Sequence, residues 1–464
     1  MDQPNNETSF SSLKLQRALI ENLTSLGYLE MTPIQAASLP HILAGTDVIG
    51  QGKTGSGKTA AFSLGLLEQL DVNSFQVQSL VLCPTRELAE QVAKEVRRLA
   101  RAVQNIRVLT LCGGVPYKTQ TGSMERGAHI IVGTPGRVEE HLRRGTLELK
   151  HLKMLVLDEA DRMFDMGFQS SLDAVIEGAP KQRQTLLFSA TYPAEIKAIA
   201  KRVMVKPIVV QVDATHDSAS IQQYLYKVGE SASRFTVLRL LLLKHRPGST
   251  LVFCNTKKET QEVAESLAAL GFSVLALHGD LEQKDRERVL VQFSNKSVSI
   301  LVATDVAARG LDIDALDAVI NYHVANDLEV HIHRVGRTGR AGSSGIACTL
   351  YSEKEQYKIE RLEAYLKQSI NSEPLPPQSF LDKPTYQPPM ATLQIGGGKK
   401  QKLRAGDILG ALTGEKGIVG EQVGKIQIFD QRAYVAVNRG VANHAVSKLS
   451  EGKLKGRSFR VWLM

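Results

Sequence analysis

A glycine-rich loop between an apolar strand and a helix constrains the fold of this 464-residue chain more than any other feature. Residues 52–59 read Gly-Lys-Thr-Gly-Ser-Gly-Lys-Thr and match the pattern G-x-x-x-x-G-K-[ST] at every position. Glycines at these spacings let backbone N–H groups approach phosphate oxygens, and the start of the helix adds partial positive charge. The loop therefore predicts an α/β fold that binds a nucleotide, with Lys58 at the β and γ phosphates and Thr59 on Mg²⁺.

A cluster of acids follows a second apolar strand. The strand is predicted over Met154–Leu157, and Asp-Glu-Ala-Asp follows it at 158–161. Open α/β sheets build their ligand sites at the carboxyl ends of parallel strands. Acids at that position suit a divalent metal and an activated water. Taken with the loop, they predict a nucleotide hydrolase or transferase, and kinase and GTPase interpretations remain open at this point.

Polar motifs end several other predicted strands. Strands alternate with helices from residue 79 to residue 191, which predicts a doubly wound sheet with one nucleotide face. The motifs are Pro-Thr-Arg-Glu-Leu-Ala at 84–89, Gly-Gly at 113–114, Thr-Pro-Gly-Arg at 134–137 and Ser-Ala-Thr at 189–191. Small, hydroxyl and arginine side chains at successive strand ends would form a shelf for a sugar–phosphate backbone.

Composition excludes several classes of protein. A content of 43% hydrophobic and 23% charged residues is ordinary for a globular protein, and no apolar run approaches the ~18 residues of a membrane span. The polar N-terminal residues argue against a secretory signal. The four cysteines are far apart, which argues against disulfides or a zinc site. A cytoplasmic protein, expected to be a monomer, fits these features.

Positive charge gathers at the C-terminal end. Residues 391–464 hold 13 Lys and Arg against 5 Asp and Glu, a surplus of eight in a chain whose net charge is +9. A basic module on a nearly neutral body indicates a polyanionic partner, nucleic acid first of all. The alternative is a solvated charged face without a ligand.

The C-terminal residues predict a small separate domain. Six prolines lie within residues 371–390, which we interpret as a stiff, partly extended linker. Beyond it we expect strand 392–395, helix 402–412, strands 425–429 and 433–437, helix 441–449 and strand 459–463. That β-α-β-β-α-β order is the order of an RRM. Tyr434 is the one aromatic residue expected for stacking on the central strands, so a sheet-face RNA site is in doubt. The basic residues lie in loops and at strand ends instead.

The order of these motifs resembles that of DEAD-box ATP-dependent RNA helicases over residues ~10–370. The second half continues the resemblance with Asn-Thr-Lys at 255–257, His-Gly-Asp at 278–280, the run from Thr304 to Asp312, and His-Arg-Val-Gly-Arg-Thr-Gly-Arg at 333–340. The resemblance implies two tandem RecA-like doubly wound parallel-sheet domains followed by the RRM-like domain. The expected boundaries are 1–210 and 211–370 for the RecA-like domains, 371–390 for the linker and 391–464 for the RRM-like domain.

The resemblance also implies a role for each matching residue. The residues expected to bind ATP are Phe10 and Gln35 at the adenine, Gly52, Lys53, Thr54, Gly55, Ser56, Gly57, Lys58 and Thr59 at the phosphates, Asp312 at the ribose, and Arg337 and Arg340 at the γ-phosphate. Asp158 would hold Mg²⁺ through water, and Glu159 would orient or deprotonate the attacking water. Asp161, Ser189, Thr191 and His333 are expected to couple ATP to domain closure. The residues expected along RNA are Arg86, Gly114, Thr134, Arg137, Gly279, Arg286 and Thr304 in the core and Lys399, Lys400, Arg404, Lys453, Lys455 and Arg457 in the tail.

The tail narrows the resemblance. Residues 404–414 and 452–457 are similar to the C-terminal domain of bacterial DbpA-type helicases, which implies a 23S ribosomal RNA hairpin as the partner and large-subunit assembly as the process. Two alternatives stay open. One is an RNA clamp or chaperone that hydrolyses ATP but unwinds little, and the other is a DNA translocase.

Overall fold

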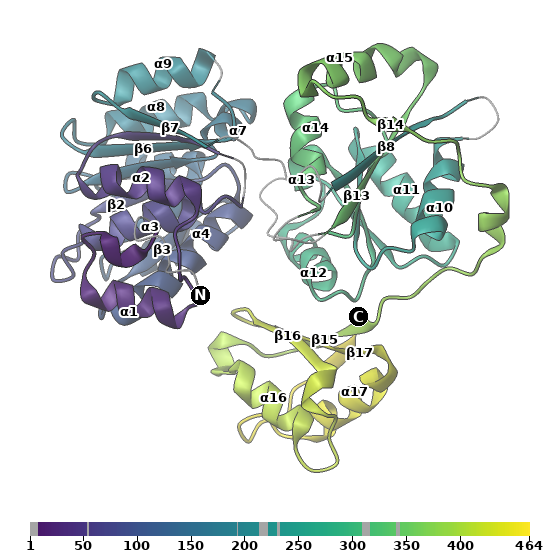
Figure 1. Cartoon of the computed structure of the whole chain (residues 1–464). Coiled ribbons are helices and arrows are strands. Elements are labelled where there is room, and N and C mark those ends of the chain that lie inside the picture. Colours follow the sequence, from purple (N-terminus) through teal and green to yellow (C-terminus); the bar gives the residue numbers. More distant parts are fainter. Residues whose placement is uncertain are drawn as a thin grey trace, which may run out of the picture. The chain divides into compact units, whose positions relative to one another are not determined.

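Three β-sheets organise the protein. The computed structural model describes residues 8–52, 55–192, 194–212, 221–229, 233–308, 316–339 and 344–464. Within these residues two seven-stranded parallel sheets are followed by a four-stranded antiparallel sheet, which confirms the predicted fold class (Figure 1). The first sheet lies in one compact unit of the chain, and the other two sheets lie in a second unit. None of the helices in the described ranges is long and apolar enough to cross a membrane.

The first sheet has the order β3-β4-β2-β5-β6-β1-β7, with every pair parallel. Its strands are β1 (Val48–Gln51), β2 (Ser79–Leu82), β3 (Val108–Leu111), β4 (Ile130–Gly133), β5 (Met154–Asp158), β6 (Gln184–Ser189) and β7 (Ile208–Gln211). The α-helices of this part are α1 (Arg17–Ser25), α2 (Pro33–Leu43), α3 (Lys58–Glu68), α4 (Arg86–Leu99), α5 (Tyr117–Met124), α6 (Pro135–Arg143), α7 (Ala160–Asp165), α8 (Gln169–Glu177) and α9 (Ala194–Val203). Strand β7 pairs with β1 and ends the sheet on that side.

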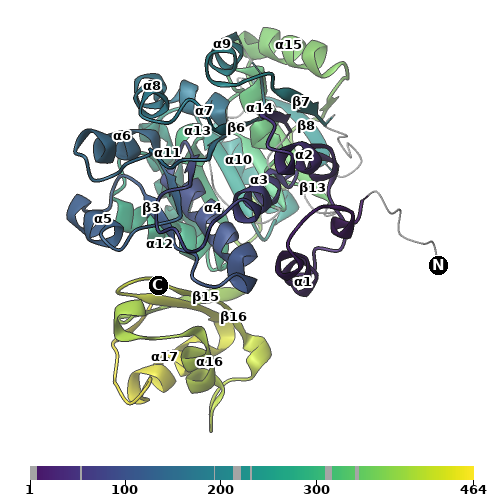
Figure 2. The ribbon, with the colours of Figure 1, turned by 90° about the vertical axis from the view of Figure 1, so that its left-hand side faces the viewer.

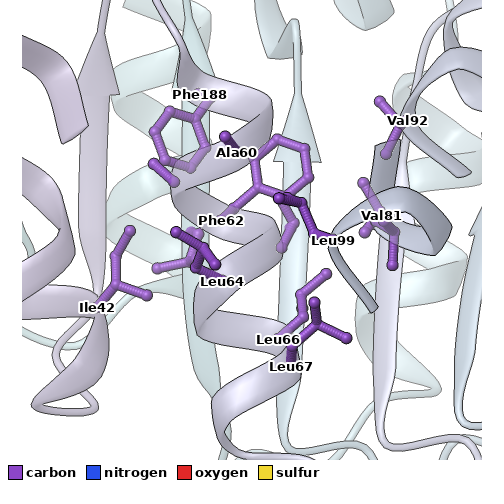
Figure 3. Packing of buried hydrophobic residues seen from close by; sticks show 14 of the residues in the cluster. Ile42, Ala60, Phe62, Leu64, Leu66, Leu67, Val81, Val92, Leu99 and Phe188 are labelled. Atoms are coloured by element: carbon purple, nitrogen blue, oxygen red, sulfur yellow. The ribbon is translucent and has the colours of Figure 1, made fainter. Parts of the chain in front are cut away.

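Helices cover both faces of the first sheet. In β5, Met154 and Val156 belong to the apolar core beside α2, α3 and α4, while Leu155 and Leu157 belong to the core beside α6, α8 and α9. Successive side chains of a strand point to opposite faces, so a strand buried on both sides must be apolar at every position. Figure 3 shows the first of these cores, with Phe62 of α3 packed near Phe188 of β6.

The second sheet repeats this arrangement with the order β10-β11-β9-β12-β13-β8-β14. Its strands are β8 (Ile221–Lys227), β9 (Thr250–Cys254), β10 (Val274–Leu277), β11 (Ile300–Thr304), β12 (Ala318–Asn321), β13 (Gly345–Tyr351) and β14 (Asn371–Ser372). The α-helices are α10 (Arg234–His245), α11 (Lys257–Ala269), α12 (Gln283–Ser294), α13 (Asp305–Ala308), α14 (Leu328–Val335) and α15 (Gln356–Leu366). Strands β8, β12 and β13 were not predicted from the sequence.

The proline-rich residues 371–390 lie along the second parallel-sheet domain. Tyr386 packs edge-on against Phe272, with ring centroids 6.3 Å apart. Arg246 donates from Nη1 to the carbonyl of Pro384 over 2.9 Å. Phe380 packs against the same apolar core. Proline lacks a backbone donor, so this segment is fixed by side chains and isolated hydrogen bonds rather than by a ladder.

The C-terminal sheet has the order β16-β17-β15-β18 and is antiparallel. Its elements are β15 (Met390–Ile395), α16 (Ala405–Thr413), β16 (Val423–Ile428), β17 (Ala433–Asn438), α17 (Ala442–Glu451) and β18 (Val461–Leu463). Both helices pack on one face of the sheet, as Figure 2 shows. Helix α16 begins three residues later than predicted, because Lys402 adopts a left-handed conformation and Asp407 caps the helix through the Arg404 N–H.

His331 makes the second parallel-sheet domain sensitive to acid. Its ring is 2% exposed in α14, and neither ring nitrogen has a hydrogen-bond partner among the described residues. Burial, with a contribution from Arg334, lowers the pKa of His331 to about 4. The unfolded chain binds a proton at this residue below pH ~6.5 whereas the folded chain does not, so stability is lost as the pH falls from there toward 4.

We therefore expect His331→Leu to weaken the acid sensitivity. Between pH 7.5 and 5.0 this group costs the wild type about 2 kcal/mol of unfolding free energy that the variant does not lose. Urea unfolding followed by circular dichroism at the two pH values measures this difference. The same change at the exposed His151 is the control. Equal pH dependence in both variants would contradict the assignment.

Candidate nucleotide and nucleic-acid sites

The glycine-rich loop is shaped by residues of α2. Gly55 and Gly57 have φ of 87° and 98°, a region that favours glycine, and α3 begins directly after the loop. The Thr32 hydroxyl donates to the Ser56 carbonyl over 2.8 Å, and Gln35 donates from Nε2 to the Gly57 carbonyl over 3.1 Å. The loop is therefore braced from outside in the position that a phosphate site at the start of α3 requires.

Gly57→Ala is expected to weaken ATP binding at least about tenfold. A tenfold loss of affinity corresponds to ~1.4 kcal/mol of binding free energy. A left-handed conformation costs an alanine ~1–2 kcal/mol. In addition, the new Cβ would lie 2.6 Å from Gln35 Nε2 and 2.6 Å from Thr32 Oγ1. Titration with a fluorescent ATP analogue measures the effect. Gly122→Ala is the control, since a Cβ there meets nothing within 4 Å. ATP affinity within twofold of wild type at position 57 would show that the loop tolerates a side chain.

Lys58 and Asp158 form the charged centre of this site. Lys58 is 6% exposed and donates from Nζ to the Gly52 carbonyl. Its burial lowers the lysine pKa, and the charges of Asp158 and Glu159 oppose that shift. Asp158 ends β5 at 3% exposure, where burial and then the Glu159 charge raise its pKa to about 7. A buried carboxylate of this kind is stabilised by a cation, so the position suits a metal-bound nucleotide.

Glu159 turns the chain from β5 into α7. It has φ of 52° and ψ of 53°, the left-handed conformation, as the residue that caps α7. A non-glycine residue in that conformation is uncommon, and such residues gather at functional sites. The Glu159 side chain is 9% exposed. A carboxylate held beside the buried Asp158 has the chemistry to orient or deprotonate a water.

Asp161 joins the acid cluster to the end of β6. Its Oδ2 accepts from the Thr191 N–H over 3.0 Å and from the Thr191 hydroxyl over 2.9 Å. The Asp161 N–H donates to Ser189 Oγ over 3.4 Å. Three of the four residues predicted to couple ATP to domain closure are thus in direct contact, although Asp161 lies in α7 and the other two at the end of β6.

The oxygen ligands expected for magnesium fit that ion. Asp158 offers a carboxylate and Thr59, at the second position of α3, offers a hydroxyl, both hard donors. No cluster of three or more His, Cys, Asp or Glu within the described ranges could hold a metal. Mg²⁺ at this position would therefore take further oxygens from phosphates and water.

The two residues expected at adenine have different surroundings. Both ends of the Gln35 amide are used, since Oε1 accepts from the Thr32 N–H over 2.9 Å and Nε2 donates to Gly57. Phe10 is 3% exposed and packs edge-on against Tyr28, with ring centroids 6.3 Å apart. Their roles at adenine stay predictions, as do those of Lys53 and Thr54, which lie outside the described residues.

The residues expected along RNA in the first domain follow three neighbouring strands. Arg86 begins α4 after β2, Gly114 follows β3 with φ of 75°, and Thr134 precedes α6 after β4. Arg137 donates from Nη1 to the Val115 carbonyl over 2.8 Å and also contacts Gln120 and Glu140. Arg137 therefore holds the segment after β3 in place.

The strand order separates these residues from the nucleotide residues. Strands β3, β4 and β2 form one side of the sheet, and β5, β6 and β1, which carry the acids, Ser189 and the loop, are adjacent on the other side. The residues predicted to bind RNA and those predicted to bind the nucleotide thus follow two adjacent groups of strands in one sheet.

The second parallel sheet carries a similar set. Gly279 follows β10 and Thr304 ends β11, and these two strands are neighbours. Arg286 of α12 donates from Nη2 to the Ala307 carbonyl of α13 over 2.8 Å. The predicted RNA residues of this domain are therefore also gathered at the carboxyl ends of adjacent strands.

Arg334 is a residue whose importance the sequence reasoning missed. It is 2% exposed, donates from Nε and Nη2 to both oxygens of Asp305 over 2.6 and 2.7 Å, and lies over the Phe253 ring. It anchors α14 to the segment after β11. Arg337 is buried three residues further on, and His333 precedes Arg334 on α14. Arg334 and Arg337 lie three positions apart in a basic motif, and this spacing could have indicated that one of them is buried and fixes the helix in place. Asp312 and Arg340 lie outside the described residues.

The basic residues expected to bind RNA in the tail gather on two loops. Lys399, Lys400 and Arg404 lie between β15 and α16, and Lys453, Lys455 and Arg457 lie between α17 and β18; all six are exposed. Lys455 joins the loops, because its Nζ donates to the Lys402 carbonyl over 2.8 Å and lies 3.2 Å from Asp407 Oδ2.

Three family models match the chain. Residues 32–199 match the DEAD/DEAH box helicase model, residues 233–342 match the helicase conserved C-terminal domain, and residues 392–463 match the DbpA RNA binding domain. The three matches follow the order of the three sheets.

Curated relatives and solved structures agree with these matches. The chain is 52% identical to the ATP-dependent RNA helicase DbpA of Escherichia coli strain K12 over 98% of this chain and 100% of that protein. It is 43% identical to the DEAD-box ATP-dependent RNA helicase CshA of Geobacillus kaustophilus over 78% of each chain. A structure of Saccharomyces cerevisiae Dbp5 bound to RNA and ADP–BeF₃ is 30% identical, with a TM-score of 0.71 over 79% of this chain and 96% of that chain.

Proposed function

Since the chain belongs to the DEAD-box family of ATP-dependent RNA helicases, we propose that it remodels 23S ribosomal RNA during assembly of the large ribosomal subunit, in the cytoplasm and as a monomer. The observation that carries this proposal is the match of residues 392–463 to the DbpA RNA binding domain, on a tail that holds a surplus of eight positive charges. Similarity to E. coli DbpA over the whole chain supports it.

We propose the following chemistry for ATP hydrolysis. Lys58 binds the β and γ phosphates with the N–H groups of the loop, whose position Gln35 and Thr32 fix. Magnesium, when bound by Asp158 and Thr59, supplies positive charge to the phosphate oxygens. Glu159 orients the attacking water and accepts its proton. Phosphoryl transfer needs little beyond this positioning and charge.

Asp161 is proposed to report the nucleotide state to the end of β6. A shift of the acid cluster on nucleotide binding would move Thr191 directly, because the carboxylate holds both its N–H and its hydroxyl. The roles that the family implies for Asp312, His333, Arg337 and Arg340 are also part of the proposal.

The ATPase rate tests the proposed substrate. We compare a ribosomal RNA hairpin fragment, random RNA of equal length and the DNA version of the fragment as stimulators. The proposal expects half-maximal stimulation at a concentration of ribosomal fragment roughly tenfold or more below that of random RNA, and little stimulation by DNA. Equal stimulation by both RNAs would refute the ribosomal assignment, and stimulation by DNA would favour a translocase. A parallel duplex-release assay shows whether the chain unwinds RNA or acts only as a clamp.

A further inference from the structure

The outer face of the C-terminal sheet packs against the second parallel-sheet domain, inside one compact unit of the chain. Thr392 of β15 is fully buried, and its hydroxyl contacts Asn295 Nδ2 over 3.1 Å and Ser297 Oγ over 2.6 Å. Gln427 of β16 donates to Ser294 Oγ at the end of α12 over 3.3 Å. These contacts cover the centre of the face opposite α16 and α17.

This packing removes the aromatic residue that the sequence offered for stacking. Tyr434 of β17 is 0% exposed and pairs across the sheet with Gln394. A ring without exposed surface cannot stack on a base while the domains are packed. Along the same row, Gln394 also pairs with Trp462 of the outer strand β18, and Trp462 remains half-buried.

A cavity of about 300 Å³ lies where this packing ends. Its lining residues are Arg288 of α12, Gln394, Arg432, Trp462, Leu463 and Met464. The volume is at the lower end of the range for small-ligand sites.

The charge around the cavity favours an anion. Arg288 and Arg432 reach it from the two domains, and Arg460 lies over the Trp462 ring, 5.1 Å from its centroid. Arg288 forms an ion pair with Asp285, with Nη1 3.6 Å from Oδ1, and the arginine side chain is 45% exposed. So weak and exposed a pair leaves the guanidinium available to a phosphate.

The β16–β17 turn, which carries Arg432, is bonded to one of the basic loops of the tail. Lys399 N–H donates to the Phe429 carbonyl over 2.8 Å, and Lys400 N–H donates to the Asp430 carbonyl over 2.9 Å. These bonds tie the loop after β15 to the β16–β17 turn that carries Arg432. On the other side, Arg288 lies on the same helix as Arg286, an expected RNA contact of the core.

We infer that this cavity, formed jointly by α12 and the C-terminal sheet, binds one nucleotide of the RNA substrate. Arginine forks suit phosphate, and an accessible indole is a stacking partner for any base. The inference rests on the proposed RNA substrate and adds that the second parallel-sheet domain and the tail hold the RNA together.

Trp462 is the only tryptophan of the chain, so its emission reports on this cavity directly. The full-length protein is titrated with a ribosomal RNA hairpin fragment and with random single-stranded RNA, and Trp462 emission and the anisotropy of labelled RNA are both recorded. We expect quenching that saturates with the anisotropy change. Arg288→Gln and Arg432→Gln should each weaken RNA binding about three- to tenfold. Each should also reduce the magnitude of the slope of log K against log salt by about 1, the value for one lost phosphate contact.

Lys416→Gln is the matched control, since it removes one exposed charge after α16 that does not line the cavity. Circular dichroism and ATPase activity without RNA verify that the variants fold. Normal RNA binding by both arginine variants overturns the inference, whether or not the emission changes. The inference is also overturned if neither RNA quenches the Trp462 emission. The ribosomal proposal fails separately, when the hairpin is not preferred over random RNA.

Discussion

Glu159→Gln is expected to bind ATP with near-normal affinity and to hydrolyse it about 10²–10⁴-fold more slowly, the range for loss of a general base. The amide keeps the size of the side chain but cannot accept a proton from water. The left-handed backbone at this residue caps α7 and does not depend on the carboxylate. Single-turnover hydrolysis and ATP-analogue titration separate chemistry from binding.

The matched control is Glu177→Gln, at the exposed end of α8. It removes one carboxylate from the same domain and should leave both constants unchanged. A Glu159→Gln single-turnover rate within a few-fold of wild type would rule out the proposed role. A large loss of ATP binding would instead assign Glu159 to the nucleotide site itself.

Removal of residues 391–464 is expected to abolish the preference for ribosomal RNA and to leave a weak, indiscriminate RNA-dependent ATPase. The tail carries eight of the nine net charges. Tethering raises the RNA concentration at the core, to roughly millimolar for a short linker. The core contacts expected along phosphates carry little sequence information. Half-maximal ATPase stimulation by ribosomal and random RNA should therefore become equal.

A full-length variant provides the control for truncation. Truncation uncovers Asn295 and Ser297, two polar residues that the tail now buries. Replacing Lys399, Lys400, Lys453 and Arg457 by glutamine keeps that packing. This full-length variant should lose most of the preference for ribosomal RNA, as the truncated chain does. The isolated tail should bind the hairpin with an affinity that falls steeply as salt rises. A truncated core that still prefers the ribosomal fragment as strongly as the full chain would place selection in the core.

Local sequence patterns indicated most of the elements that carry the candidate nucleotide site. The glycine-rich loop, the apolar run before Asp158 and the Ser-Ala-Thr end of β6 each depend on a few consecutive residues, so each could be recognised alone. Strands β8, β12 and β13 were missed because their sequences lack a polar motif at the carboxyl end. Helix α16 was started too early because the left-handed turn at Lys402 interrupts a helical pattern without a glycine.

By itself the sequence determined the classes of element, the phosphate loop, the acids and the basic tail, because backbone preference and apolar periodicity act between near neighbours. Only the tertiary structure decided which distant groups meet. The strand order sets the residues predicted to bind RNA next to those predicted to bind the nucleotide. Asp161 accepts a hydrogen bond from Thr191, thirty positions away, and the buried Arg334 pairs with Asp305. Tyr434 is buried on the sheet face that packs against the second parallel-sheet domain, for the same reason. Burial and pairing depend on packing between elements, and no short stretch of sequence encodes that packing.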